Sequence, residues 1–223
     1  MEQSTDFWAP RMCLLPPIPE LAIAADLLDE AADALLAGDR DRARARLREA
    51  DTPTVHAFAA KIMESWDTVI HRRRQVERPI NVTKVPDRRP SQGIQTEVFA
   101  RDAWRCRYCG VRVVLPKARK VLVDAFPDAV CWSGKDKGLH AAFFALSAVA
   151  DHVMPHVLGG SSDVNNPVTT CQCCNYGEGD RLLGEAGLID PRTRLPVVDA
   201  WDGLGRLLYY REVAPASGVE APE

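Results

Sequence analysis

The sequence predicts an α+β fold, in which a small helical domain precedes a domain of short strands and helices. Apolar residues recur at helical spacing through the first third of the chain. Short strand-like segments and turn signals follow later, beside two C-x-x-C pairs. A stretch without periodicity, rich in proline and arginine, separates these two regions. With 223 residues the chain can form one ordinary domain or two small ones.

The predicted boundaries follow these changes in pattern. They are 1–19 for an N-terminal extension, 20–77 for the helical domain, 78–92 for a basic linker, 93–203 for the mixed domain with an insertion at about 116–146, and 204–223 for a C-terminal tail. The tail has the Pro, Ser, Gly and Ala composition of a frayed terminus, so we expect no structure there.

Charge is distributed unevenly along the chain. The overall balance is −3, and 46% hydrophobic with 26% charged residues excludes wholesale disorder. Fourteen basic and four acidic side chains give residues 72–120 a net charge of +10, whereas residues 1–71 carry −6 and residues 121–223 carry −7. The basic stretch is a candidate phosphate-binding surface. On charge alone, a solvated basic face explains it equally well.

The sequence predicts a cytoplasmic protein without a membrane segment. The longest apolar candidate, residues 139–150, is too short to cross a bilayer and is interrupted by His140 and Ser147. The N-terminus has early acids and no basic segment followed by an apolar one, so we do not expect a secretory signal. In a reducing compartment, seven cysteines favour metal ligands over disulfides.

Three helices are predicted in the first third. The first covers residues 20–37 and is stopped by Gly38, and Asp39 can cap a second at residues 40–50. Thr52 and Pro53 open a third that runs toward Arg74. A protein partner or self-association through these helices is left open.

The mixed domain is predicted to alternate strands, turns and helices. The expected elements are a strand at 111–115, an amphipathic stretch at 118–126 within the insertion, a strand at 147–153, a flexible loop at 159–163, a return strand at 167–170 and a helix from Cys174 to about Leu183.

Two C-x-x-C pairs form a candidate zinc site. Cys106, Cys109, Cys171 and Cys174 supply four thiolates, as a tetrahedral structural zinc requires. Sixty-one residues separate the pairs, so a folded segment must lie between them, and closing the longer loop costs little. A redox dithiol or buried free cysteines are the alternatives. Cys173 could compete as a ligand, and Cys13 and Cys131 are expected to be small apolar residues.

A family resemblance emerges from the segments RDAWRCRYCG and ADHVMPHVLGGSSDVNNPVTTCQCCN. These segments contain, in order, the first C-x-x-C pair (here called a knuckle), Asp-His, a Gly-Gly loop, Asn, the second knuckle and Asn. This order resembles that of the HNH endonucleases, and within them the subclass with a four-cysteine zinc site. The resemblance covers about residues 95–180, apart from the insertion. It implies a ββα-metal fold stapled by zinc.

The resemblance also implies catalytic roles. Asp151 and Asn175 would hold Mg²⁺ or Mn²⁺, and His152 would be the general base that activates water. Asn166 would hold the His152 loop and the ring orientation by hydrogen bonding. Asn175 occupies a position where many members have histidine, which makes the chain an HNN variant. As an isolated feature, the Asp-His pair is better explained as a turn, and the asparagines could be turn or cap residues. Taken together with the two C-x-x-C pairs, the catalytic interpretation is favoured.

Basic residues near the first knuckle are predicted to contact nucleic acid phosphates. They are Arg101, Arg105, Arg107, Arg112, Lys117 and Lys120, with Arg119 beside them. The resemblance implies that the substrate is double-stranded DNA and that a helix of the protein enters its minor groove. Glu178 and Asp180 depart from the family, in which many members carry Lys or Arg soon after the third-position residue.

The predicted function is metal-dependent hydrolysis of DNA phosphodiester bonds, with zinc as a structural ion. One alternative is a non-catalytic, zinc-dependent nucleic-acid-binding module. Another is an adaptor that acts through the N-terminal helices. His140 and His156 receive no assigned role, although His156 could line the site.

Overall fold

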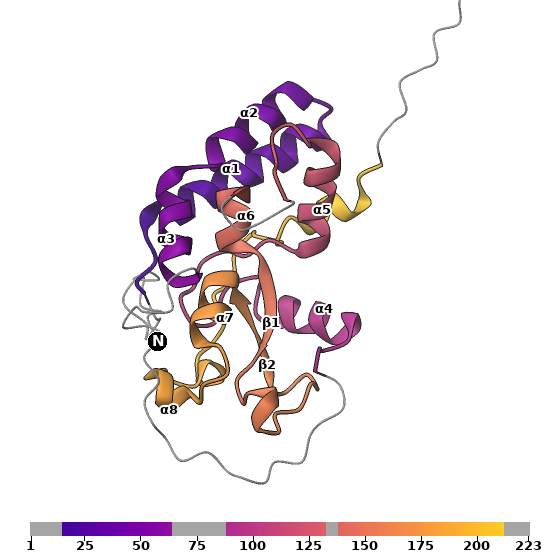
Figure 1. The fold of residues 1–223 in the computed structure, drawn as a ribbon. Coiled ribbons are helices and arrows are strands. Elements are labelled where there is room, and N and C mark those ends of the chain that lie inside the picture. Colours follow the sequence, from indigo (N-terminus) through magenta and orange to yellow (C-terminus); the bar gives the residue numbers. More distant parts are fainter. Residues whose placement is uncertain (1–14, 64–87, 133–137, 212–223) are drawn as a thin grey trace, which may run out of the picture.

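The computed structural model describes residues 15–63, 88–132 and 138–211 of the chain. It combines helices with one small two-stranded sheet, which confirms the predicted α+β class. In the ribbon, three N-terminal helices lie at one end of the molecule and the two strands lie toward the other (Figure 1). Within the described ranges, no helix is both long and apolar enough to span a membrane.

The three N-terminal helices form where the sequence predicts them. They are α1 (Pro19–Leu36), α2 (Arg40–Ala50) and α3 (Pro53–Met63). The Asp39 carboxylate accepts a hydrogen bond from the Arg42 N–H at 3.0 Å, which caps α2 as expected. The predicted continuation of the third helix toward Arg74 and linker residues 78–87 lie outside the described residues.

The rest of the chain builds a hairpin flanked by helices. Its elements are α4 (Gln92–Arg101), α5 (Pro116–Ala125), α6 (Ala141–Leu146), β1 (Ala148–His152), β2 (Pro167–Cys171), α7 (Gln172–Glu178) and α8 (Leu183–Ala186). β1 and β2 pair antiparallel, with Asp151 opposite Val168 and His152 opposite Pro167. Both α4 and α7 contact the two strands, and they flank the hairpin in the ribbon (Figure 1). α5 and α6 make the predicted insertion helical.

The predicted strand at 111–115 is not a strand, because its backbone bonds go to three different segments. Val113 N–H donates to the Trp104 carbonyl at 2.9 Å, Val114 N–H to Leu146 at 2.9 Å, and Leu115 N–H to Gly203 at 3.0 Å. Only isolated bridges result, from Arg112 to Arg105 and from Val114 to Ser147. The apolar run therefore threads the core instead of extending the sheet.

The helix predicted from Cys174 to about Leu183 is displaced toward the N-terminus. α7 begins at Gln172, directly after β2, and ends at Glu178. Gly179 has a φ of 66°, a positive value that glycine adopts without strain, and the helix ends there.

The prediction that residues 204–223 form a tail without structure is wrong for the first residues of that segment. A short 3₁₀ helix, η5 (Gly205–Tyr209), follows Gly203, and Leu204 and Leu207 are fully buried. Arg206 ties this segment to α1 through Asp29 and Asp33, with the Nε atom 2.9 Å from the Asp33 carboxylate. Composition alone did not reveal this docking. Residues 212–223 lie outside the described part of the chain.

One hydrophobic core joins the N-terminal helices to the rest of the molecule. Buried residues of α1, α2 and α3 belong to the same cluster as those of α5, α6 and the knuckles. α3 packs on both α6 and α7. The division of the chain at 78–92 stays a prediction, whereas the packing of the described residues is continuous across it.

His140 connects the insertion to the N-terminal helices. Its ring is fully buried, and Nε2 lies 2.8 Å from the Leu47 carbonyl of α2. A carbonyl only accepts, so Nε2 carries the proton. Burial lowers the pKa of His140 from its ordinary value of 6.5, although the hydrogen bond to Leu47 partly opposes this shift. The ring is therefore neutral in the folded protein at pH 7.

We expect His140 to make the protein sensitive to acid. Below pH 6.5 the unfolded chain takes up a proton on this ring while the folded chain resists, so stability falls as pH drops from 6.5 toward the lowered pKa. The slope approaches about 1.4 kcal/mol per pH unit for one proton. In His140→Gln, which keeps a donor but does not titrate, urea unfolding between pH 5 and 7 should lose that component. An unchanged pH slope in the variant would contradict this account.

Candidate functional site

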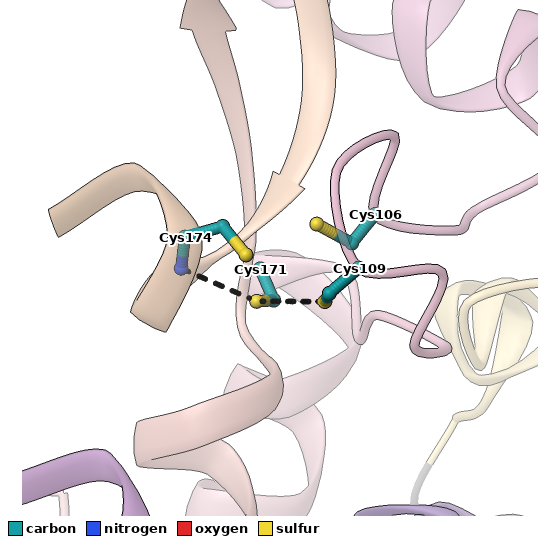
Figure 2. Close-up of side chains that lie close together, drawn as sticks. All are labelled: Cys106, Cys109, Cys171 and Cys174. Atoms are coloured by element: carbon teal, nitrogen blue, oxygen red, sulfur yellow. Dashed lines mark hydrogen bonds between the residues drawn. The ribbon is translucent and has the colours of Figure 1, made fainter. Parts of the chain in front are cut away.

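The four cysteines of the two C-x-x-C pairs come together in the fold. Cys106 and Cys109 lie on the loop after α4, whereas Cys171 ends β2 and Cys174 lies in α7. Figure 2 shows the sulfurs facing one another between that loop and the start of α7. All four residues are buried, and their sulfurs all lie within 4.8 Å of one another.

The spacing of the sulfurs fits a tetrahedral metal ion. Cys109 Sγ and Cys171 Sγ are 3.8 Å apart. Four sulfurs bound at about 2.3 Å to one zinc are about 3.8 Å from one another, whereas a disulfide joins its sulfurs at about 2.05 Å. The six described cysteines are all unbridged. The cluster can therefore hold a metal ion with thiolate ligands.

The thiols of the cluster influence one another's ionisation. Hydrogen bonds from Cys106 and Cys109 lower the pKa of the Cys171 thiol well below its ordinary value. Hydrogen bonding and burial instead raise the pKa of Cys109 and of Cys174. A cation bound among the four sulfurs would stabilise their thiolate forms.

The remaining described cysteines lie outside the four-sulfur group. Cys173 is buried beside it, but its sulfur is not one of the four that converge. Cys131 is exposed, so its predicted role as a small apolar residue is wrong. Cys13 lies outside the described residues.

Backbone bonds hold the first knuckle against the sheet. Gly110, with a φ of 82°, turns the chain so that its N–H donates to the Cys106 carbonyl at 2.8 Å. The Arg107 N–H donates to the Thr169 carbonyl of β2 at 2.8 Å. The buried Asp102 carboxylate also accepts a hydrogen bond from the Thr169 N–H at 2.7 Å. These hydrogen bonds therefore join the knuckle to β2 in addition to the four-cysteine cluster.

Asp151, His152 and Asn175 line one cleft of about 820 Å³. β1 brings Asp151 and His152 to its floor, and α7 brings Asn175, which directly follows a cysteine of the cluster. The other predicted site residue, Asn166, is buried beneath the neighbouring loop and does not line the cleft.

Asp151 is a buried carboxylate with an unsatisfied oxygen. Only 8% of the residue is exposed, and its Oδ2 has no hydrogen-bond partner among the described residues. Burial raises the pKa of Asp151 to about 7, against the effect of the His152 backbone N–H, and the nearby Cys171 thiol raises it further. A buried charged oxygen without a donor is costly, and a cation would satisfy it. The residue thus fits a divalent metal ligand.

The His152 side chain is half-buried, and one of its ring nitrogens forms a hydrogen bond. Its Nε2 lies 2.9 Å from the Ser162 hydroxyl, and its ring is edge-on to that of His156 with centroids 5.9 Å apart. Burial lowers the pKa of His152, and the positive charges of His156 and Arg88 lower it further. The ring is therefore neutral at pH 7, as a general base must be. Ser162 was not identified from sequence, because a serine in a Gly-Gly-Ser-Ser loop gives no distinguishing signal.

Asn166 fastens the loop that follows His152. Its Oδ1 accepts from the Met154 N–H at 2.8 Å, and its Nδ2 donates to the carbonyls of Met154 at 3.0 Å and Ser161 at 2.8 Å. All three contacts are with loop backbone. Orientation of the His152 ring falls instead to Ser162, which the same loop carries.

Gly160 allows this close approach. A methyl group on its Cα would overlap the Met154 carbonyl and lie 2.9 Å from Asn166 Nδ2. We therefore expect Gly160→Ala to push the loop away from Asn166, to cost about 1–3 kcal/mol, and to move Ser162 off His152. Gly184→Ala is the matched control, because nothing lies within 4 Å of its added carbon. Thermal unfolding checks the difference, and equal stability of the two variants would refute the steric argument.

The four arginines predicted to contact phosphate make hydrogen bonds within the protein. Arg101 pairs with Asp102 at 2.9 Å, and Arg105 pairs with Asp199. The side chain of Arg107 is only 8% exposed and donates to the Pro191 carbonyl at 2.8 Å.

Arg112 pairs with Asp26 of α1 and lies over the Trp201 ring. Arg119, noted beside this set, lies 3.9 Å from the centroid of the Trp132 ring. Arg112 therefore joins α1 to the segment after the knuckle, and Arg105 and Arg107 join the knuckle region to the C-terminal segment. Lys117 and Lys120 are on exposed parts of α5, where they contact Gln92 and Asp124. The nucleic-acid role of the six predicted residues stays a prediction.

Other charged residues line the cleft itself. Arg88 and Arg89 are exposed at its edge, and Arg181 and His156 also line it. Sequence reasoning placed Arg88 and Arg89 only in a linker. It regarded Glu178 as a departure from the family, whereas this residue is fully buried and also lines the cleft.

Part of this region matches a known protein family. Residues 130–181, which span β1, β2 and α7, match the family of HNH endonucleases. Comparison with curated proteins and comparison with solved structures each return no match. The family supports nuclease-type chemistry and divalent metal binding for this part of the chain.

Proposed function

We propose that the chain, whose residues 130–181 match the HNH endonuclease family, is a metal-dependent endonuclease that hydrolyses DNA phosphodiester bonds. One observation carries the proposal most directly. Asp151, His152 and Asn175 line a single cleft beside the four-cysteine cluster. An oxygen ligand, a neutral imidazole and an amide oxygen around one cleft are what a hydrolase of this type needs.

Asp151 and Asn175 would hold the catalytic cation, Mg²⁺ or Mn²⁺. Both ions prefer oxygen donors, and the unpartnered buried Oδ2 of Asp151 fits this role. When bound, the cation supplies positive charge that stabilises the phosphate and its leaving oxygen.

His152 would accept the proton of the attacking water. Its lowered pKa keeps the ring neutral near pH 7, and the contact between Nε2 and Ser162 fixes the ring. Nδ1 can act as the base when Nε2 carries the ring proton and donates a hydrogen bond to the Ser162 hydroxyl. Asn166 contributes indirectly, by holding the loop that carries Ser162.

The four-cysteine cluster would bind a structural zinc ion. This ion would join the loop after α4 to the end of β2 and the start of α7. Since Asn175 directly follows Cys174, the zinc would also fix the position of one ligand of the catalytic cation. Zinc and the catalytic cation therefore have separate roles in the proposal.

We propose double-stranded DNA as the substrate, contacted by Arg88 and Arg89 at the cleft and by Lys117 and Lys120 on α5. Such phosphate contacts make binding strongly dependent on salt. A cytoplasmic location is part of the proposal, since a reducing compartment keeps thiolate ligands unoxidised. The N-terminal helices stay a candidate surface for a protein partner or self-association.

The proposal predicts that the purified protein cuts supercoiled plasmid when Mg²⁺ or Mn²⁺ is present. Treatment with a chelator should abolish cleavage, and adding Mg²⁺ alone should restore it if zinc content, measured in the same sample, is unchanged. Gel electrophoresis of the plasmid reports nicked and linear products. Salt-dependent binding without cleavage in either cation would contradict the proposal and favour a non-catalytic nucleic-acid-binding module.

A further inference from the structure

Glu178 is a buried acid that the proposed reaction does not use. The residue is fully buried in α7, and neither of its carboxylate oxygens has a hydrogen-bond partner among the described residues. It nevertheless lines the same cleft as Asp151 and Asn175. Burying an acid without any donor is costly, so this side chain requires a specific explanation.

The geometry of α7 puts Glu178 beside the proposed cation ligands. Asn175 and Glu178 are three residues apart in the helix and therefore share one face. α7 packs on β1, which carries Asp151. Burial, and to a lesser extent the negative charge of Asp151, raises the pKa of Glu178 to about 9.

The positive charge of Arg181 only partly offsets these effects. Arg181 lowers the pKa of Glu178, but its Nε donates to the Glu178 backbone carbonyl at 3.0 Å and not to the carboxylate. Two carboxylates with unsatisfied oxygens, next to an amide oxygen, form a donor set suited to a hard dication. Such an ion would satisfy the free oxygens and balance both negative charges.

We infer that Glu178 is a further protein ligand of the divalent cation held by Asp151 and Asn175. The inference rests on the proposed function, since it concerns the same cation site. It predicts a site with two carboxylates, which neutralise the Mg²⁺ or Mn²⁺ charge. Such a site holds its cation more tightly than one built from Asp151 and Asn175 alone.

Calorimetric titration with Mn²⁺ tests this ligand directly. The full-length, zinc-loaded protein carries His152→Ala, so binding is measured without turnover. Adding Glu178→Gln should weaken Mn²⁺ binding by about tenfold or more, as loss of metal-supporting groups does in other sites. Asp180→Asn is the matched control, since it removes an acid from the same cleft lining but should change the dissociation constant by no more than about twofold.

The possible results separate this inference from the function it rests on. If Glu178→Gln leaves the Mn²⁺ dissociation constant unchanged while Asp151→Asn in the same background abolishes binding, Glu178 is a buried acid only and the inference fails. If neither variant alters binding, the proposed cation site fails as well. Should Glu178→Gln not fold, Glu178→Asp keeps the charge on a shorter side chain. Normal Mn²⁺ affinity in that variant would overturn the inference, and weakened affinity would support it.

Discussion

Cys171→Ser is expected to lose zinc and to destabilise the hairpin, α7 and the elements that pack on them. Cys171 ends β2, caps α7 by accepting from the Cys174 N–H at 3.4 Å, and lies 3.8 Å from Cys109 across the cluster. Zinc binding supplies about 10–16 kcal/mol in zinc-finger peptides, which is as much as the whole stability of a typical domain. A serine hydroxyl cannot replace the thiolate, so most of this free energy should be lost.

The loss should extend beyond the cluster, because other elements pack on it. Leu21 of α1 and Phe58 of α3 line a small apolar cavity together with Cys109, Cys171 and Cys174. Opening the cluster would expose this surface to water. We therefore expect a single unfolding transition at much lower temperature, not a local change confined to the hairpin.

Two serine variants serve as controls for the zinc prediction. Cys131→Ser alters an exposed cysteine and should keep one zinc per chain and the parental melting temperature. Cys173→Ser should keep zinc and lose only modest stability, because it places a hydroxyl in a buried position. Zinc is quantified by atomic emission and unfolding by circular dichroism. Full zinc content in Cys171→Ser, or loss of zinc in Cys173→Ser, would contradict the ligand assignment.

Regular spacing carries the part of this site that could be predicted from sequence. Each C-x-x-C pair aims two thiolates at one point, so the four cysteines could be matched across sixty-one intervening residues. The strands that carry Asp151 and Cys171 were likewise predicted within one residue at each end, because turn signals on either side define them locally.

Features that depend on distant partners could not be predicted. Arg112 belongs to a basic stretch in the sequence, but its ion pair with Asp26 lies 86 residues away. The docking of Arg206 on α1 likewise turns an expected tail into a packed segment. A charge run does not say whether its members meet phosphate or carboxylates. The burial of Glu178 could not be predicted either, since an acid near a helix end gives no sign that tertiary packing will bury it.

His152→Ala should reduce plasmid cleavage by about 10²–10⁴-fold, the usual contribution of a general base. Asp151 and Asn175 stay in place in this variant, so metal content and melting temperature should change little. His56→Ala is the matched control, because that ring stacks on Phe144, with centroids 5.6 Å apart, and does not line the cleft. Equal cleavage by His152→Ala and the parent would contradict the assignment of His152 as base.

The pH dependence of cleavage gives a second and independent test of the same residue. The pKa of His152 lies below 6.5, so the rate should stay high at neutral pH and fall only as pH drops through that lowered value. His156→Ala removes one of the positive charges that disfavour the imidazolium. It should therefore raise the pKa of His152 and move the acid limb of the rate profile to higher pH. NMR titration of the His152 ring should move in the same direction, because both measurements report the proton on one nitrogen. If only the rate profile moved, the limb would belong to another group.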